Sequence, residues 1–195
     1  MRKFIATLKE RLAFRANPYF RALADGSFDR EDFVETQIQF CFAVVFFSRP
    51  MAVLAARLPH AEMRLLLLEN VGDEHGHGDL RFSHERTFLT LLERLGVSRP
   101  YADSRAMWPE IRSFNTVLTG LSTFDDTLTA LAAFGIMEDL FSEISAAIGR
   151  AIVERGWLAK EQVVHYATHQ KLDVEHADGF YRLLDGPWEK DPVAR

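Results

Sequence analysis

Apolar side chains recur every three or four positions along most of the chain, a spacing that is typical of amphipathic α-helices. No stretch shows the strict alternation of apolar and polar residues that indicates a β-strand. The pattern predicts helices over residues up to 12, 29–47, 50–58, 61–75, 80–95, 109–121, 123–155 and 159–185. We therefore expect one all-α domain over residues 1–195, a bundle of about seven or eight helices.

Turn-forming residues set the ends of these helices. Asp29 with Asp32 has the form of an N-cap and its partner, and the SRP stretch (48–50) is expected to end that helix. Two glycines in the GHGD stretch break the chain before Asp79, which is placed to cap the next helix. Residues 97–105 are expected to form a loop, and residues 186–195 an irregular tail.

Composition narrows the class of protein. With 195 residues, 48% of them hydrophobic, the chain is long enough for one sizeable core. The net charge of −5 is spread along the chain without a basic block, which argues against nucleic acid as a partner. The single cysteine, Cys41, suits a reducing cytoplasm, and no signal peptide or membrane-spanning apolar run is evident. We expect a soluble cytoplasmic protein that does not enter a membrane.

The stretch HQKLDVEH places three polar side chains on one side of the last helix. His169, Asp173 and His176 fall within an arc of about 60° when successive residues are drawn 100° apart. That side adjoins the apolar face and must be mostly covered. A buried, unpaired carboxylate costs several kcal/mol, so this group needs a partner. The partner is either a histidine in a hydrogen-bonded core cluster or a bound cation.

Two further polar residues lie on faces that look buried. Glu138 has Phe134 one turn before it and Phe141 about one turn after it, and His84 shares a stripe with Phe88. Each also has a purely structural interpretation. Glu138 could pair with an arginine in the core, and His84 could be a hydrogen-bonded core histidine.

The glycine-rich segment NVGDEHGHGD holds Glu74 at the end of a helix that otherwise faces the core. His75 and His77 in the same segment are either metal ligands or exposed turn residues, and we favour the turn. Glu74 and His77 have the Glu-x-x-His spacing of ferritin-like diiron bundles, but that architecture needs a second such pair, which the sequence lacks.

Four helices thus each direct acidic or imidazole groups inward. The six groups are Glu74, His84, Glu138, His169, Asp173 and His176. Three carboxylates and three neutral imidazoles suit two divalent cations, with a residual charge of about +1. A set of oxygen and nitrogen donors without thiolate favours iron or manganese over structural zinc.

These motifs resemble those of the haem-oxygenase-like dimetal oxidases, also described as iron-containing redox enzymes, and the resemblance runs from about Phe33 to Leu184. ENVGDEHGHGDLRFSHERTFLTLL is similar to that family's N-x-x-D-E-x-G-x-G…H signature, and the glutamate of GIMEDL and HQKLDVEH follow in the same order. The resemblance implies a haem oxygenase-like helical bundle without haem. It also implies that the six inward groups are the metal ligands.

The spacing of the first two ligands differs from that of some members of this family. Those members place the glutamate and histidine seven residues apart on one continuous helix, whereas Glu74 and His84 are ten residues apart. On an unbroken helix this pair would point about 80° apart. We therefore expect the GHG insert to bulge or break the helix.

The resemblance implies a non-haem diiron (or iron–manganese) oxidase or oxygenase that uses O2 to oxidise a small organic substrate. Electrons would come from the substrate or from an external donor, and a homodimer is expected on the same ground. One subgroup converts its own tyrosine to p-aminobenzoate. It has tyrosines where this chain has Met137 and His165, so self-modification is not expected here. The sequence assigns no role to Tyr19 or Tyr166.

Two alternatives stay open. A metal-free enzyme of the same fold, similar to pyrroloquinoline quinone synthase or the thiaminase-type hydrolases, would use histidines and carboxylates as acids and bases. A thiaminase-type hydrolase would also need a nucleophilic cysteine, for which Cys41 is the sole candidate. A non-enzymatic metal-binding or interaction protein could reuse the same bundle.

Overall fold

The computed structural model describes residues 1–190, and within them every regular element is helical, which confirms the all-α prediction. The α-helices are α1 (Arg2–Leu12), α2 (Pro18–Asp25), α3 (Arg30–Arg57), α4 (Ala61–Glu74), α5 (His84–Arg94), α6 (Arg99–Ser104), α7 (Pro109–Thr123), α8 (Thr127–Glu154) and α9 (Val164–Lys190). Short 3-10 turns are η1 (Phe14–Ala16), η2 (Gly76–Gly78), η3 (Leu80–Phe82) and η4 (Lys160–Gln162).

Local sequence explains where several helices begin. Asp29 Oδ1 accepts a hydrogen bond from the Glu31 amide at 2.7 Å at the start of α3, as its cap-like setting predicts. Asp126 Oδ1 accepts from the Thr129 amide at 2.9 Å at the start of α8. Each side chain satisfies an amide that the first turn of a helix leaves without a partner.

Two predicted helix boundaries are wrong because tertiary contacts continue the helix past a proline. α3 runs through Pro50 to Arg57, since Met51 and Leu54 beyond the proline are fully buried. That burial outweighs the cost of about 3 kcal/mol for an interior proline. α9 begins at Val164 rather than 159 and ends at Lys190 rather than 185, so the first half of the expected irregular tail, residues 186–190, is helical. The rest of that tail, 191–195, lies outside the described residues.

Two further differences come from caps that sequence periodicity did not reveal. Asp79 caps only the turn η3, and Ser83 caps α5, so α5 begins at His84 rather than at residue 80. The expected loop over residues 97–105 contains α6, whose N-cap Ser98 accepts a hydrogen bond from the Tyr101 amide. Serine caps of this kind stabilise a helix start without an apolar stripe.

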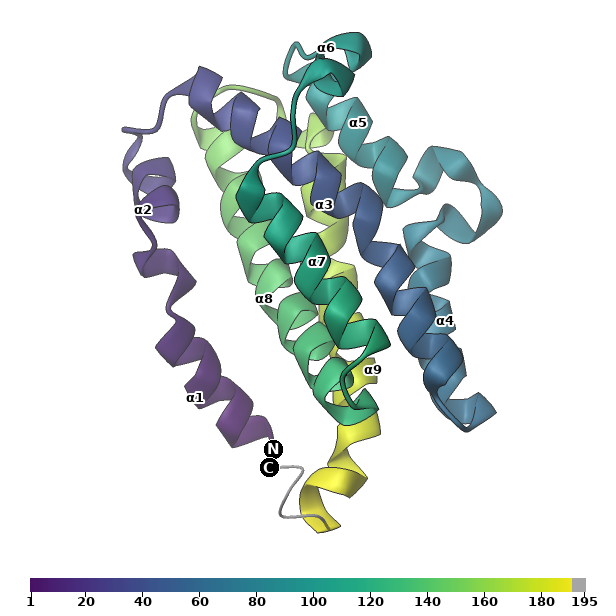
Figure 1. The fold of residues 1–195 in the computed structure, drawn as a ribbon. Helices are drawn as coiled ribbons and strands as arrows, with labels where there is room; N and C mark the ends of the chain where they lie inside the picture. The colour runs from purple at the N-terminus through teal and green to yellow at the C-terminus, as the bar shows by residue number, and fades with distance from the viewer. Residues whose placement is uncertain (191–195) are drawn as a thin grey trace.

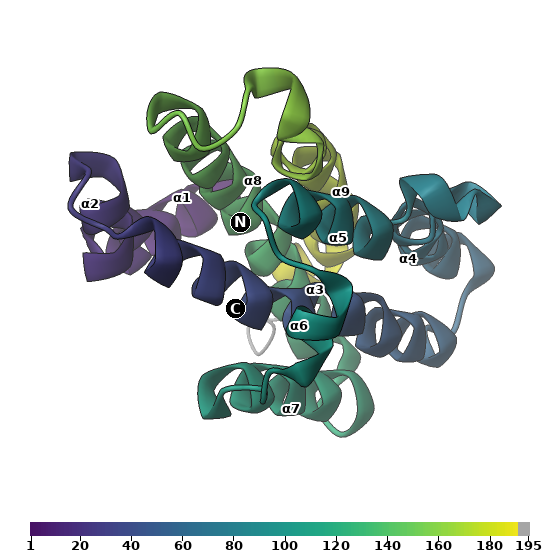
Figure 2. The same cartoon turned by 90° about the horizontal axis from the view of Figure 1, so that it is seen from above.

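The long helices pack around α3 and the antiparallel pair α8–α9 (Figures 1 and 2). In the view from above, α3 crosses the middle of the molecule, with α7 on one side and α8 and α9 on the other (Figure 2). α4 and α5 contact both α3 and α9. This arrangement brings α4, α5, α8 and α9, the helices of the six inward groups, around one volume.

Two glycines on α8 let α9 approach closely. A Cβ atom on Gly135 would lie 3.0 Å from both Phe180 Cβ and Tyr181 Cε1, and one on Gly149 would lie 3.3 Å from Tyr166 Cβ. Such approaches are tighter than most Cβ contacts, so a side chain at either position would require α9 or its side chains to shift by a few tenths of an ångström. Close pairing of α8 and α9 brings the side chains between the two glycines face to face.

The interior is divided into two hydrophobic cores. One contains Phe88 and Tyr166, and we call it the Phe88 core; the other contains Phe134 and Ala177, and we call it the Phe134 core. Glu138 on α8 follows Phe134, and the polar residues of α9 lie between Tyr166 and Ala177. The six inward groups are therefore placed at the junction of two apolar regions.

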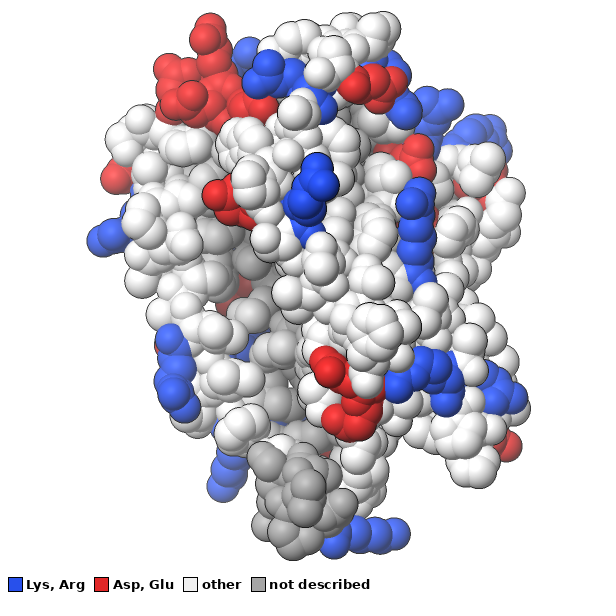
Figure 3. All heavy atoms as spheres, in the orientation of Figure 1, with Lys and Arg blue, Asp and Glu red and all other residues white. Residues whose placement is uncertain are grey.

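α3 is also the single helix among residues 1–190 that is long and apolar enough to cross a membrane by length and composition. It contacts α4, α5, α7 and α8, as the core helix of a bundle does, so its composition is weak evidence for a membrane span. On the face shown in Figure 3, basic and acidic side chains are interspersed. The cytoplasmic location and the absence of a nucleic-acid partner stay predictions.

α1 lies beside the bundle (Figure 1), and charged side chains connect it to α8. Lys9 Nζ lies 2.5 Å from Asp139 Oδ1 and 2.6 Å from Glu143 Oε1. A groove of about 670 Å³ runs between α1 and α8, and Tyr181 of α9 also lines it. None of the six inward groups lines this groove.

Candidate metal centre

The structure brings all six predicted ligands together. Glu74 comes from α4, His84 from α5, Glu138 from α8, and the other three from α9. Each of the six side chains is at most 7% exposed, and Asp173 is fully buried. Six ionisable groups at this burial need partners of opposite charge or protons, because isolated buried charges are too costly to persist. We call this set the six-residue cluster.

One half of the cluster joins α4 and α5 to α9. Glu74 Oε1 lies 2.8 Å from His84 Nδ1. The rings of His84 and His169 contact each other with their centroids 4.2 Å apart. His169 Nδ1 in turn lies 2.9 Å from Asp173 Oδ1. These contacts link three separate helices through side chains that are all plausible metal donors.

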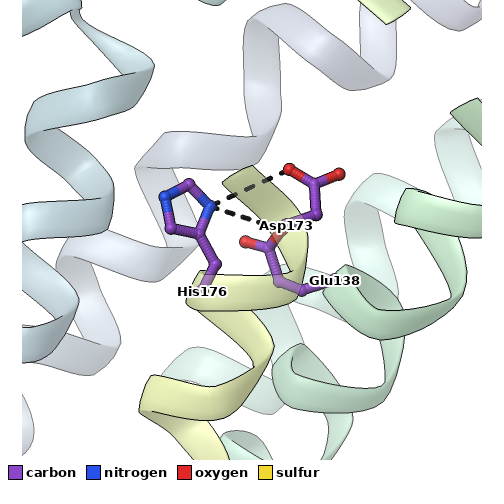
Figure 4. A group of neighbouring side chains, drawn as sticks. All are labelled: Glu138, Asp173 and His176. Atoms are coloured by element: carbon purple, nitrogen blue, oxygen red, sulfur yellow. Dashed lines mark ion pairs between the residues drawn. The ribbon is translucent and has the colours of Figure 1, made fainter. Parts of the chain in front are cut away.

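The other half joins α8 to α9. His176 Nδ1 lies 3.7 Å from Glu138 Oε2 and 3.9 Å from Asp173 Oδ1, and all three side chains point toward one another in Figure 4. One donor atom from each of the three lies within 4.8 Å of the others. Both distances are too long for a hydrogen bond, but they leave the three donors facing a common point. Asp173 belongs to both halves and connects them.

The predicted irregularity between Glu74 and His84 is confirmed. α4 ends at Glu74, and Gly76, His77 and Gly78 all have positive φ angles of 61°, 50° and 91°. The chain then makes a second turn before α5 begins at His84. The break removes the angular mismatch that ten residues of continuous helix would impose, and the two side chains meet.

Free nitrogen atoms in the cluster fit a bound cation. His169 Nε2 and His176 Nδ1 are buried and have no hydrogen-bond partner within residues 1–190. Buried polar atoms are nearly always hydrogen-bonded, so such nitrogen atoms beside buried carboxylates fit a site for a cation. The structural alternative for Glu138, in which it pairs with an arginine in the core, is wrong. Its carboxylate accepts a hydrogen bond from the Asn70 amide group at 2.9 Å rather than pairing with an arginine.

Without metal, protons neutralise part of the cluster. Burial raises the pKa of Asp173 to about 8. Burial alone would lower the pKa of His176, but the carboxylates of Glu138 and Asp73 outweigh it and raise that pKa to about 9. Burial, with the neighbouring His84 ring, lowers the pKa of His169 to about 3, so this imidazole is neutral. Groups that bind cations and protons alternatively are typical of metal sites.

Two histidines of the glycine-rich segment lie outside the cluster. His75 and His77 are exposed, as the turn interpretation predicts. His77 Nε2 lies 2.7 Å from Asp73 Oδ1, so Glu74 and His77 do not act as a Glu-x-x-His pair. Asp73, which sequence analysis placed in this segment without a role, also contacts the cluster through His176.

His165, which is buried, is a fourth histidine beside the three of the cluster, and the sequence assigned it no role. Its ring centroid lies 4.4 Å from that of His169. Thr87 Oγ1 donates its single proton to the His84 carbonyl, so it accepts a hydrogen bond from His165 Nδ1–H at 3.0 Å. Nε2 of His165 therefore carries a lone pair, and it has no hydrogen-bond partner among the described residues. The sequence could not reveal this role, because the apolar pattern around His165 is the same for a metal-site histidine and for an ordinary core histidine.

Comparisons with known proteins identify the family and the fold of the chain. A family model described as "iron-containing redox enzyme" matches residues 34–193. No curated protein sequence matches the chain. Among solved structures, a domain of unknown function with a haem oxygenase-like fold from Shewanella denitrificans OS217 is similar, with a TM-score of 0.75 and 16% sequence identity. The match covers 93% of this chain and 75% of that one, and at this identity it shows the fold. The chain therefore has a haem oxygenase-like fold and belongs to the iron-containing redox enzyme family.

Proposed function

We propose that the protein is a non-haem dimetal oxidase or oxygenase that uses two iron ions, or iron with manganese, and O2 to oxidise a small organic substrate. The observation that carries this proposal is the convergence of six carboxylate and imidazole side chains, each at most 7% exposed, from four helices. Membership of the iron-containing redox enzyme family supports it. All six donors are nitrogen or oxygen atoms, a set that suits iron and manganese.

The two halves of the cluster suggest two ion positions. Glu74, His84 and His169 would hold one ion, and Glu138 and His176 the other, with Asp173 between them. Iron bound there would supply one-electron redox chemistry and activation of O2.

The chain's own residues orient these donors. Asp173 accepts a hydrogen bond from His169 Nδ1–H, which leaves the lone pair on His169 Nε2 for an ion. Phe141 contacts the His169 ring, with centroids 5.2 Å apart, and Phe88 contacts the His165 ring at 4.8 Å. These rings keep water from one side of the histidines and favour a substrate with an apolar part.

The thiaminase-type alternative is weakened by the environment of Cys41. Burial raises the pKa of this thiol to about 11, so the thiolate is scarce at neutral pH. Cys41 also packs against the Phe88 core as a small apolar residue. No observation favours the metal-free acid–base enzyme over the oxidase.

We also propose that electrons come from an external donor or from the substrate, and that the enzyme acts in the cytoplasm, as a homodimer.

Anaerobic loading with Fe(II) tests the proposal. The wild type should bind about two irons per chain and give an optical transient on addition of O2, because both halves of the cluster supply donors. His169→Ala and Glu138→Ala should each abolish the transient and keep the helical circular dichroism spectrum. A variant that keeps its oxygen reactivity would contradict the assignment, and metal uptake without any reaction with O2 would favour a storage or interaction protein.

A further inference from the structure

α4 reaches the cluster with more than one side chain. Asn70, Asp73 and Glu74 lie three and four residues apart, so they share the helix face that points toward α8 and α9. Glu74 is a proposed ligand. The other two contact proposed ligands carried by other helices, and neither belongs to the six-residue cluster.

Asn70 holds Glu138. Its side chain is 3% exposed, and Nδ2 donates a hydrogen bond to Glu138 Oε1 at 2.9 Å. This contact occupies one carboxylate oxygen and leaves Oε2 facing His176. Asn70 Oδ1 is buried without a hydrogen-bond partner among the described residues, so the contact to Glu138 is what orients the amide.

Asp73 holds His176 from the side opposite to the proposed ion. Asp73 Oδ2 accepts a hydrogen bond from His176 Nε2–H at 3.0 Å. A carboxylate bonded to one ring nitrogen directs the lone pair of the neutral imidazole to the other nitrogen. That nitrogen, Nδ1, is the one that faces Glu138 and Asp173.

His77 holds Asp73 from the solvent side. Its Nε2 lies 2.7 Å from Asp73 Oδ1, so both oxygens of Asp73 are engaged. His77 adopts a left-handed backbone conformation, and a Cβ atom on Gly72 would lie 3.3 Å from His77 Nδ1. The break after α4 thus places the His77 ring against the last turn of α4, within reach of Asp73.

From these contacts we infer that Asn70 and Asp73 are positioning residues of the metal centre. They orient Glu138 and His176 toward the ion position shared with Asp173, and His77 stabilises Asp73 in that role. The inference rests on the proposed function, because it assumes that this position binds a metal ion. It adds that a single turn of α4 serves both ion positions, one through Glu74 and the other through Asn70 and Asp73.

Titration with Co²⁺ under anaerobic conditions tests this inference, with visible absorption and equilibrium dialysis as readouts. Asp73→Ala and Asn70→Ala should each lower the affinity for the ion at the Glu138–His176 position by about 10- to 100-fold. The affinity for the other ion should stay near its wild-type value. Asp73→Asn keeps the size and an acceptor oxygen, so it should fold like the wild type and lose less affinity than Asp73→Ala. His77→Ala should have a smaller effect in the same direction.

Two matched controls separate positioning from general destabilisation. Asn115 is also a buried asparagine, donates to the Phe42 carbonyl and has an Oδ1 without a partner among the described residues, but it lies on α7, which carries none of the six groups. Asp79 is an acid of the same segment that bonds Arg81. Asn115→Ala and Asp79→Ala should bind both ions as the wild type does.

The outcomes distinguish a failure of the proposed function from a failure of the positioning role of Asn70 and Asp73. A wild type that binds no Co²⁺ would overturn the proposed function. A wild type that binds two ions, with folded Asn70 and Asp73 variants that bind both equally well, would overturn the positioning role alone. Equal weakening of the binding of both ions, in step with a loss of stability, would show a merely structural role and overturn it too.

Discussion

At the scale of single residues, protons and metal ions compete for the same atoms. In the metal-free protein, burial holds the pKa of Asp173 at about 8, and Glu138 and Asp73 hold that of His176 at about 9 against the opposing effect of burial. Both groups therefore carry a proton at pH 7. Each must release it before its oxygen or nitrogen can bind a cation.

This competition predicts that metal affinity rises with pH. Between pH 6 and pH 8 the free protein binds more protons than the metal complex, so affinity should rise by roughly tenfold per pH unit for each proton displaced. The rise should level off above about pH 9, where His176 is already neutral. Isothermal titration calorimetry in buffers of different ionisation enthalpy measures the released protons. His176→Ala should release fewer, and an affinity that does not change with pH would contradict the prediction.

A site residue could be predicted from the sequence where it is a polar residue among apolar neighbours on one helix face. Glu138 was evident because it interrupts a run of aromatic residues on one helix face, and the burial of the other five followed from similar stripes. Asn70 and Asp73 belong to the N-x-x-D-E-x-G-x-G…H signature, but the sequence could not reveal their partners, because their roles arise from hydrogen bonds to α8 and α9. Periodicity within one helix carries no information about a partner on another.

At the scale of secondary structure elements, sequence analysis succeeded where a single side chain decides a boundary. Asp29 caps α3 as expected, and Asp126 caps α8, which begins at Thr127, four residues after the expected start at residue 123. Sequence analysis failed at Pro50, where Met51 and Leu54 beyond the proline are fully buried, and at Pro187, where Trp188 contacts the Phe4 ring. At Pro50 a penalty of about 3 kcal/mol is small beside the burial of two apolar side chains.

The break between α4 and α5 allows a matched comparison of two glycines. Gly76→Ala should destabilise the protein by roughly 1–3 kcal/mol, because a Cβ atom there would lie 2.8 Å from the Ser83 amide nitrogen as well as in a left-handed conformation. Gly78→Ala has the same left-handed strain but open space around the Cβ atom, so it should cost only about 1 kcal/mol.

Urea denaturation monitored by circular dichroism measures both costs. Because Ser83 caps α5 directly before His84, Gly76→Ala should also weaken metal binding, whereas Gly78→Ala should not. Equal losses for the two variants would show that backbone strain alone decides their stability and that the contact with Ser83 is unimportant.

At the scale of the whole molecule, the cluster occupies the junction of the Phe88 core and the Phe134 core. Four helices meet there, and in the metal-free state they are linked by ion pairs, ring contacts and protonated groups. Two cations at this position would connect α4 and α5 to the α8–α9 pair directly. Folding and metal binding are therefore expected to be linked.

This linkage predicts that metal raises the melting temperature. A ligand that binds only the folded state stabilises it by about 2.7 kcal/mol at a free concentration one hundred times its Kd. For a chain of this size that corresponds to a shift of roughly 5–10 °C. Differential scanning calorimetry with Fe(II) or Mn(II) should show the shift, and a chelator should reverse it. His169→Ala should show a much smaller shift, and an equal one would place the stabilising ion elsewhere.

The left-handed turn at Gly76 and His77 also bears on how related proteins are found. Because the backbone leaves its helical path after Glu74, the number of residues before His84 is not tied to whole turns of helix. Connectors of other lengths could deliver the same carboxylate and imidazole to the same place. A search pattern with a rigid gap between these two residues would miss such homologues, whereas one that lets the gap vary would recover them.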